Sequence, residues 1–253
     1  MQQYDAYAAA YDRSGQLRFS ILMDVYLRDL LRSHAVPGWT MVDLACGTGT
    51  LALLMAERGW TVLGLDNSPA MLAQAEQKRA TLNKPVAVQF GQADMRDFAL
   101  ATPVDLVTCC FDTLNYLTAE AELACCLAAV ARALVPQGLF CFDLATDYFL
   151  RHYWQGVEFE EFDGYSQVMH SHYDAATGCS TLVLTGFTAT ASGSYQRFRE
   201  VHVERAYPDV VVRQLLAQAG LVVEAVYDCF TLQPPNERSL RLMYVARRRP
   251  PDE

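Results

Sequence analysis

Between residues 40 and 145, short runs of apolar residues alternate with longer amphipathic stretches. The short runs are rich in β-branched and aromatic residues and have the length of strands buried on both faces; they are 40–46, 61–66, 86–90, 104–111 and 138–145. The stretches with helical spacing are 50–58, 69–82 and 119–134, and the second has Ser68 as its expected N-cap before Pro69. This alternation predicts an α/β fold with a doubly wound, mostly parallel sheet and helices on both of its faces.

The pattern changes on both sides of this region. Two further strands, 221–227 and 241–246, bring the expected sheet to seven strands in a Rossmann-like arrangement. Over 156–207, alternating segments separated by D-G, T-G and S-G-S turns predict an antiparallel β lid. Ligands of open α/β sheets bind beyond the carboxyl ends of the strands, so a lid inserted after the fifth strand is expected to cover that site.

Residues 4–33 have the spacing of one or two amphipathic helices. The chain is therefore expected to have four segments. These are a helical cover at 1–35, the ligand-binding α/β core at 36–150, the substrate-capping lid at 151–207, and the completion of the core sheet at 208–253.

Composition narrows the function classes. The 253-residue chain is 52% hydrophobic and 19% charged, which provides ample apolar area for a core. Its formal net charge of −9 disfavours nucleic acid and anionic membranes as partners. The eight cysteines include no C-x-x-C and no metal-ligand spacing, which favours reduced thiols and no metal site. Neither a signal peptide nor an apolar stretch of about 18 residues is evident, so we expect a cytoplasmic protein outside the membrane.

A glycine-rich turn follows the first predicted strand. Gly47, Gly49 and Ala52 match G-x-G-x-x-A, and Asp66 follows at roughly the distance expected in a dinucleotide-binding unit. In such a unit the turn binds pyrophosphate, which a nearby carboxylate would repel. Asp43 places a carboxylate four residues before Gly47. This favours S-adenosylmethionine, which has no phosphate and carries a cationic sulfonium and ammonium.

Four motifs, each at the end of a predicted strand, resemble those of class I S-adenosylmethionine-dependent methyltransferases. They are D-L-A-C-G-T-G at 43–49, with Ala45 where many members have glycine, L-D-N-S-P-A-M-L at 65–72, G-Q-A-D-M-R-D-F at 91–98, and F-D-T-L-N-Y-L at 111–117. The resemblance covers nearly the whole chain. Within the class, the chain most resembles small-molecule enzymes with an antiparallel lid, such as nucleotide-linked amino-sugar N-methyltransferases. It implies S-adenosylmethionine as cofactor, S-adenosylhomocysteine as product, and a small-molecule acceptor methylated at nitrogen or oxygen.

The resemblance also implies which residues bind the cofactor. Asp66 would take the ribose hydroxyls, Asp94 would contact the adenine amino group, and Met95 would pack on the ring. Phe111 opens the loop that passes under the transferred methyl, and Tyr11 lies in a segment that folds over the methionine moiety. The full set is Tyr11, Asp43, Ala45, Gly47, Gly49, Asp66, Asn67, Met71, Asp94, Met95 and Phe111.

Several of these residues have a structural alternative. Asp43 could cap the following helix. Asp97 could form a local cap beside Asp94, and Met95 and Phe111 could be ordinary core residues.

Methyl transfer is an in-line displacement that depends on positioning, and an amine acceptor also needs a free lone pair, which favours a general base. Along an extended 199–205 segment, Glu200, His202 and Glu204 share one face while Val201 and Val203 share the other. The polar face either lines the cavity or, if the valines pack on the domain, meets solvent.

The candidate catalytic residues are Tyr116, Tyr11, His202 and Glu204. Tyr116 lies in the loop expected under the methyl group. Tyr11 and Tyr7 lie in the cover segment, where packing on the core is the alternative for Tyr7. The pair formed by His170 and His172 ranks lower, because a lid histidine is more often structural than catalytic.

Competing functions follow from the same motifs. The glycine pattern also fits an NAD(P)-dependent oxidoreductase, although no hydride-transfer constellation is recognisable. Another reaction of S-adenosylmethionine such as cyclisation, or a non-catalytic binding protein, would keep the same binding motifs. Nucleic-acid methylation is disfavoured because residues 111–116 read F-D-T-L-N-Y rather than N-P-P-Y or D-P-P-Y. The oligomeric state stays open between a monomer and a homodimer.

Overall fold

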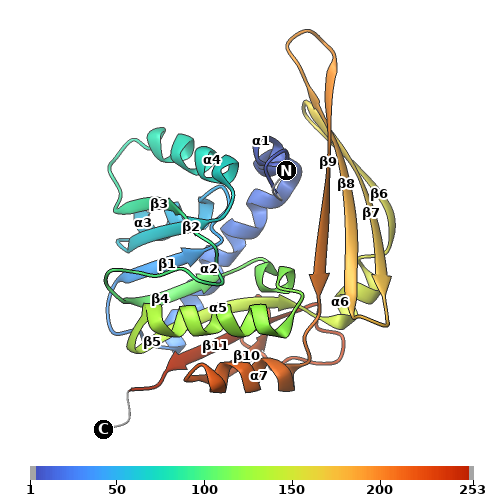
Figure 1. Ribbon diagram of the computed structural model, residues 1–253. Coiled ribbons are helices and arrows are strands. Elements are labelled where there is room, and N and C mark those ends of the chain that lie inside the picture. Colours follow the sequence, from blue (N-terminus) through green and yellow to red (C-terminus); the bar gives the residue numbers. More distant parts are fainter. Residues whose placement is uncertain (1–3, 251–253) are drawn as a thin grey trace.

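A computed structural model describes residues 4–250, which form a seven-stranded sheet and a separate four-stranded sheet (Figure 1). Residues 1–3 and 251–253, the ends of the first and last expected segments, lie outside the described residues. The large sheet has the strand order β10-β11-β5-β4-β1-β2-β3. Its strands are β1 Thr40–Leu44, β2 Thr61–Asp66, β3 Val88–Gln92, β4 Val104–Cys109, β5 Leu134–Ala145, β10 Leu221–Asp228 and β11 Arg241–Arg248.

All neighbouring strands of the large sheet are parallel except β11, which runs antiparallel to both β5 and β10. This confirms the expected Rossmann-like, mostly parallel sheet. Because the order reverses between β1 and β4, the carboxyl ends of these two strands flank a crevice, which is where open α/β sheets bind ligands.

Helices cover both faces of the large sheet. The helices of the described residues are α1 Ala8–Tyr11, α2 Leu17–Ser33, α3 Thr50–Glu57, α4 Pro69–Ala80, α5 Glu120–Ala133, α6 Asp147–His152 and α7 Asp209–Gln218. Of these, α1 and α6 pack at the small sheet. A π-helical turn at Asp12–Gln16 joins α1 to α2. The apolar residues that α2 and α3 bury belong to one cluster. The apolar residues that α5 and α7 bury belong to another cluster, on the opposite face of the sheet. Ser68 caps α4 as expected, because its Oγ accepts a hydrogen bond from the Met71 amide at 3.3 Å.

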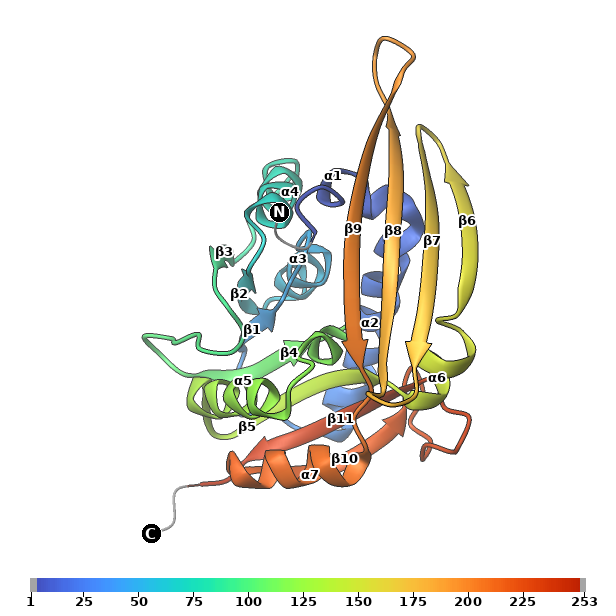
Figure 2. The same cartoon turned by 45° about the vertical axis from the view of Figure 1, so that its right-hand side comes forward.

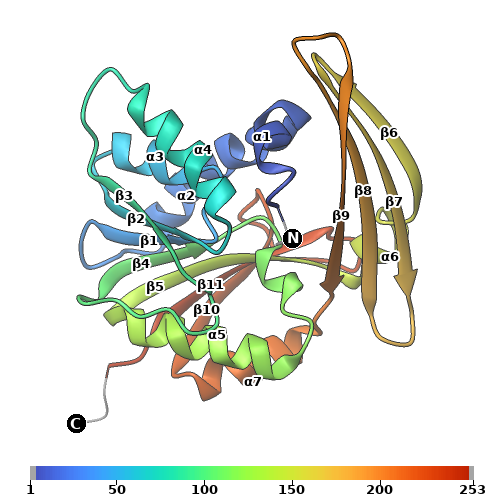
Figure 3. The ribbon, with the colours of Figure 1, turned by 45° about the horizontal axis from the view of Figure 1, so that its top comes forward.

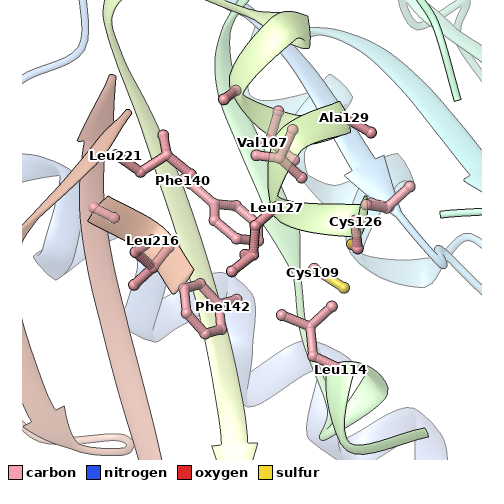
Figure 4. Close-up of a cluster of buried hydrophobic side chains, with 14 of the residues drawn as sticks. Val107, Cys109, Leu114, Cys126, Leu127, Ala129, Phe140, Phe142, Leu216 and Leu221 are labelled. Carbon is pink, nitrogen blue, oxygen red and sulfur yellow. The ribbon is translucent and has the colours of Figure 1, made fainter. Parts of the chain in front are cut away.

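The cluster under α5 and α7 forms the larger apolar core (Figure 4). Phe140 and Phe142 of β5 point from the sheet toward Leu127 of α5 and Leu216 of α7. Burial of this apolar area is the main force that fixes the helices on the sheet. The result is a rigid platform for the loops at the carboxyl ends of the strands.

The structure departs from the expected elements in three places. The helix α7 was not expected; three consecutive valines, Val210 to Val212, hide the helical spacing that buries Val212, Leu215 and Leu216. The strand β5 begins directly after α5, at Leu134 rather than residue 138. The strand β3 is only partly buried because it is an edge strand, so the expectation of burial on both faces is wrong for it.

The small sheet is an antiparallel meander, as expected, with the order β6-β7-β8-β9. Its strands are β6 Gly156–Phe162, β7 Tyr165–Asp174, β8 Cys179–Ala189 and β9 Tyr195–Arg205. It stands beside the core as a lid, with α1 between α4 and β9 (Figures 2 and 3). The helix α6 spans the boundary expected between residues 150 and 151. The division into four segments stays a prediction.

Within residues 4–250, no helix is long and apolar enough to cross a membrane.

Candidate active site

The glycine turn after β1 contains three residues with left-handed backbone: Ala45 at φ +56°, Gly47 at φ +54° and Gly49 at φ +73°. A Cβ at Gly49 would lie 2.7 Å from both the Ala75 side chain and the Phe90 ring. A Cβ at Gly47 would have no atom of the described residues within 4 Å. Gly49 therefore allows α3 to pack against its neighbours, while Gly47 leaves its backbone open to a ligand.

Replacing Ala45 with glycine is expected to raise the free energy of unfolding by about 0.5–1 kcal/mol. A left-handed non-glycine residue costs roughly 1–2 kcal/mol, and the greater freedom of glycine in the unfolded chain offsets part of that gain. Urea denaturation measures the difference. A lower free energy of unfolding in the Ala45→Gly variant would contradict the strain inferred from the φ of +56°.

Asp66, at the carboxyl end of β2, is bound to the glycine turn. Its Oδ2 accepts a hydrogen bond from the Gly47 amide at 2.8 Å, and its Oδ1 accepts one from the Ser68 amide at 2.8 Å. Burial raises the pKa of Asp66, and these backbone bonds act against the rise. A carboxylate has about four acceptor sites, so two are left for a ligand. The carbonyl of the next residue, Asn67, accepts a hydrogen bond from the Gln92 amide group at 3.1 Å.

Asp43 lies beneath the turn and is only 3% exposed. Thr108 Oγ1 donates a hydrogen bond to its Oδ1 at 2.8 Å. Burial raises the pKa of Asp43 to about 7, although Thr108 and the Ala52 amide lower it. Gly49, and not Asp43, is the N-cap of α3, which has no side-chain cap.

Of the two residues expected at the adenine, Asp94 is bound by a cation and Met95 packs against the apolar core. Asp94 is engaged by Arg96, whose guanidinium lies 2.6 Å from one carboxylate oxygen and also bridges to Glu122 at 2.7 Å. The hydrogen bonds from Arg96 lower the pKa of Asp94 despite partial burial. Met95 is partly buried against the apolar cluster under α5, and Met71 is buried at the start of α4. The contact of Asp94 with adenine stays a prediction.

The loop after β4 is held in an unusual backbone conformation. Phe111 at φ +70° and Asp112 at φ +47° are consecutive non-glycine residues in the left-handed region. Asp143 of β5 accepts hydrogen bonds from both of their amides, at 2.7 and 2.9 Å. Arg241 of β11 bridges Asp112 and Asp143, and the Phe111 ring stacks on Phe19 of α2 at 4.1 Å. Sequence motifs do not contain this network, because its members come from four distant elements.

Asn115, in the 3₁₀ turn Thr113–Tyr116, connects this loop to the lid. Its amide group donates to the Arg205 carbonyl at 2.9 Å and to the Ala145 carbonyl at 3.1 Å, and its oxygen accepts from the Ala145 amide at 2.9 Å. These bonds join the end of β9 to the turn that carries Tyr116. The Tyr116 side chain is thereby held beside the inner face of the lid.

The polar face of β9 points inward. Glu200, His202 and Glu204 are 5%, 3% and 1% exposed, whereas Val201 is 39% exposed. The sequence pattern left open whether these three polar residues face inward or face solvent. Their burial shows that they face inward. By contrast, His170 and His172 are both exposed.

Tyr116 and His202 meet in one hydrogen-bonded chain. The Tyr116 hydroxyl lies 2.6 Å from the Tyr4 hydroxyl and 3.2 Å from His202 Nδ1. Burial raises the pKa of Tyr116 well above its usual range. The hydroxyl therefore stays protonated and can both donate and accept. Glu204 lies near this chain, since its charge and that of Tyr116 influence each other.

The N-terminal segment is attached to both the lid and the core. The Glu200 carboxylate accepts hydrogen bonds from the amides of Tyr4, Ala6 and Tyr7 at 2.9, 2.8 and 3.0 Å. Burial acts to raise the pKa of Glu200, but the facing His202 and these amides leave it lowered.

At the core, Asp12 accepts a hydrogen bond from Thr48 of the glycine turn at 2.7 Å and pairs with Lys78 of α4 at 2.5 Å. Tyr11, beside Asp12, makes edge-on ring contacts with Tyr4 and Tyr7 at 6.0 and 5.4 Å. Tyr7 is buried in a cluster with Tyr165, Leu182 and Leu184, so it packs on the lid rather than on the core.

The sequence is similar to known proteins along its whole length. Residues 41–138 match the family model described as a methyltransferase domain. A protein of Geobacillus sp. (strain WCH70) that carries the name of a methyltransferase is 30% identical over 247 residues, which are 97% of this chain and 99% of that protein. A dTDP-3-amino-3,4,6-trideoxy-alpha-D-glucopyranose N,N-dimethyltransferase of Streptomyces venezuelae is 28% identical over 204 residues, which cover 78% of this chain and 81% of that protein.

The fold is similar to solved structures as well. An amino pentose methyltransferase of Micromonospora echinaspora, solved with bound S-adenosylmethionine, is similar over 98% of this chain and 98% of its own. The identity is 25% and the TM-score is 0.71.

Proposed function

Because the chain belongs to the S-adenosylmethionine-dependent methyltransferases, we propose that it methylates a nitrogen atom of a small, amine-bearing acceptor. The methyl donor is S-adenosylmethionine, and the product is S-adenosylhomocysteine. The nicotinamide alternative is set aside because a relative that matches over 97% of this chain is named as a methyltransferase. No observation favours cyclisation.

The observation that carries the proposal is the polar cluster under the lid, in which His202 and Glu204 are buried and Tyr4 and Tyr116 are half-buried. It lies at the carboxyl end of the sheet, the side on which the glycine turn opens. Among the described residues of this cluster, acidic side chains outnumber cations: Asp112 and Asp143 bind the guanidinium of Arg241, and Glu204 lies within its electrostatic influence. An excess of buried negative charge favours a cationic or amine ligand. The two relatives named above that act on amino sugars support the same class of acceptor.

The cofactor supplies a methyl group activated by the positive sulfonium. The work of the chain is to hold donor and acceptor in line and to exclude water, which for well-oriented reactants removes much of the barrier. Asp143 and Arg241 fix the loop that leads to Tyr116, and Asn115 locks that loop to the lid. The hydroxyls of Tyr116 and Tyr4 are placed to orient an amine by hydrogen bonds.

For the cofactor we propose the roles expected from the motifs. Asp66 holds the ribose hydroxyls with its remaining lone pairs, and the backbone of Gly47 and Gly49 approaches the methionine and ribose. Asp94 and Met95 take the adenine, Phe111 lies under the methyl group, and Tyr11 closes over the methionine moiety. Ala45, Asn67 and Met71 shape the backbone around these contacts. Asp43 places a carboxyl group beneath the turn.

Methyl transfer from S-adenosylmethionine labelled in its methyl group tests the proposal. The acceptors are a panel of small amines, amino sugars among them, with alcohols and carboxylates of matched size. The proposal expects label in amine acceptors and none in their hydroxyl counterparts. Label confined to hydroxyl or carboxylate acceptors would contradict it.

A cytoplasmic location and the choice between monomer and homodimer stay predictions.

A further inference from the structure

Two buried polar atoms in the cluster under the lid lack a hydrogen-bond partner. Within residues 4–250, Glu204 Oε2 and His202 Nε2 are the buried side-chain atoms that have none. His202 Nε2 lies 3.3 Å from Glu200 Oε2, but not in hydrogen-bond geometry. Glu204 is 1% exposed, so water does not reach its free oxygen from the surface. A buried carboxylate oxygen without a partner is costly, and its presence needs an explanation.

The surroundings of Glu204 compensate its charge only in part, because Arg241 and the Tyr116 hydroxyl act to lower its pKa. Asp112 adds negative charge, and burial together with that charge raises the pKa of Glu204 well above its usual range. The nearby cation, Arg241, is already bound by Asp112 and Asp143. A carboxyl group in this setting is a stronger base than an ordinary glutamate and gains most from a cation brought by a ligand.

The position of Glu204 in the fold suits a contact with the methyl acceptor. It precedes Arg205, whose carbonyl is bound by Asn115 at 2.9 Å, so it is held beside the turn that carries Tyr116. It also points inward with His202, two residues away on the same strand face. Neither Glu204 nor His202 lies in the four cofactor motifs, which leaves both free for the second substrate.

We propose that Glu204 is the catalytic residue that binds the ammonium form of the acceptor and removes its proton. This inference rests on the proposed function, because it names the charged form in which the amine enters the site. His202 Nε2 lines the same subsite and offers it a second polar contact. The substrate class is therefore a basic amine, and an amide or alcohol of the same shape lacks the charge that Glu204 needs.

The ammonium binds the ionised form of Glu204, so any proton on this carboxyl leaves to solvent as the acceptor enters. The bound ammonium then gives one proton to Glu204 Oε2, and the electron pair of that N–H bond becomes the lone pair of the neutral amine. This pair forms the new bond to the methyl carbon, while the pair of the broken carbon–sulfur bond stays on sulfur. S-adenosylhomocysteine leaves neutral at sulfur, and the methylated nitrogen carries the positive charge.

Sinefungin tests this inference without a known acceptor. It resembles S-adenosylmethionine but carries an amine in place of the methyl sulfonium, so it places an ammonium at the position of the transferred group. Isothermal titration compares sinefungin with S-adenosylhomocysteine for the wild type, Glu204→Gln and Glu158→Gln. Glu158 is an exposed carboxylate on the same lid, so its variant is a matched control for the change of charge. We expect the wild type to bind sinefungin at least about tenfold more tightly than S-adenosylhomocysteine.

In Glu204→Gln this preference is expected to disappear, while S-adenosylhomocysteine binds within about twofold of the wild type. Glu158→Gln should keep the preference. A wild type without the preference, or a Glu204→Gln variant that keeps it, would overturn the inference. If Glu204→Gln does not fold, Glu204→Ala also removes the charge, and a preference for sinefungin retained in that variant would overturn the inference. A wild type that binds neither compound would instead refute the proposed function.

Discussion

Replacing Asp66 with alanine is expected to weaken the binding of S-adenosylhomocysteine about 100-fold, or ~2.7 kcal/mol. The carboxylate organises the site in two ways. It holds the amides of Gly47 and Ser68 at 2.8 Å, and under the proposed function its remaining lone pairs accept the ribose hydroxyls. Hydrogen bonds to a charged group contribute about 1.5–3 kcal/mol each, so the loss of the ribose contacts accounts for the effect. Isothermal titration measures it.

Two further variants make the Asp66 result specific. Asp97→Ala removes an exposed carboxylate from the third motif and should leave the affinity unchanged. Asp66→Asn keeps one acceptor oxygen and should fall between the wild type and alanine. An Asp66→Ala protein that is folded and binds S-adenosylhomocysteine like the wild type would show that the ribose lies elsewhere.

Gly49→Ala is expected to lower the free energy of unfolding by about 3 kcal/mol. The left-handed backbone, at φ +73°, costs a non-glycine residue roughly 1–2 kcal/mol. The added Cβ would also lie 2.7 Å from the Ala75 side chain and the Phe90 ring, and overpacking of this kind costs about 1–3 kcal/mol. Urea denaturation gives the change in stability.

Gly47→Ala is the matched comparison, because its φ of +54° is similar but its Cβ meets open space. We expect this variant to lose only about 1–2 kcal/mol of stability and to lose most of its affinity for S-adenosylhomocysteine. Equal losses of stability in the two variants would mean that packing at Gly49 is unimportant. Unchanged affinity in Gly47→Ala would mean that the cofactor does not use the open space.

The large sheet and its ligand-binding edge were predictable from sequence because the signals are local. Buried parallel strands read as continuous apolar runs, and the Ser68-Pro69 pair marks the start of α4. The helix α7 was not predictable in this way, because β-branched valines hide its spacing until the burial of Val212, Leu215 and Leu216 is seen. The edge position of β3 depends on strand order, which no local pattern contains.

The residues of the site likewise divide into those that local sequence predicts and those that only tertiary contacts bring together. The glycine turn and Asp66 are close in sequence, and the turn's motif indicated both. The contact of Glu200 with the Tyr4 amide joins residues 196 apart, and that of Arg241 with Asp112 joins residues 129 apart. Alternation along β9 predicted that Glu200, His202 and Glu204 share a face. Which face lies inward depends on the N-terminal segment that packs against it, and this is a tertiary property.

We propose that the crevice at the glycine turn binds the methyl donor rather than a nicotinamide dinucleotide. Parallel isothermal titrations of the wild type with S-adenosylhomocysteine and with NADH test it most directly. The account predicts a saturating isotherm with one site per chain for S-adenosylhomocysteine and no heat of binding for NADH. A clear NADH isotherm with silence from S-adenosylhomocysteine would contradict the account and every cofactor contact proposed from it.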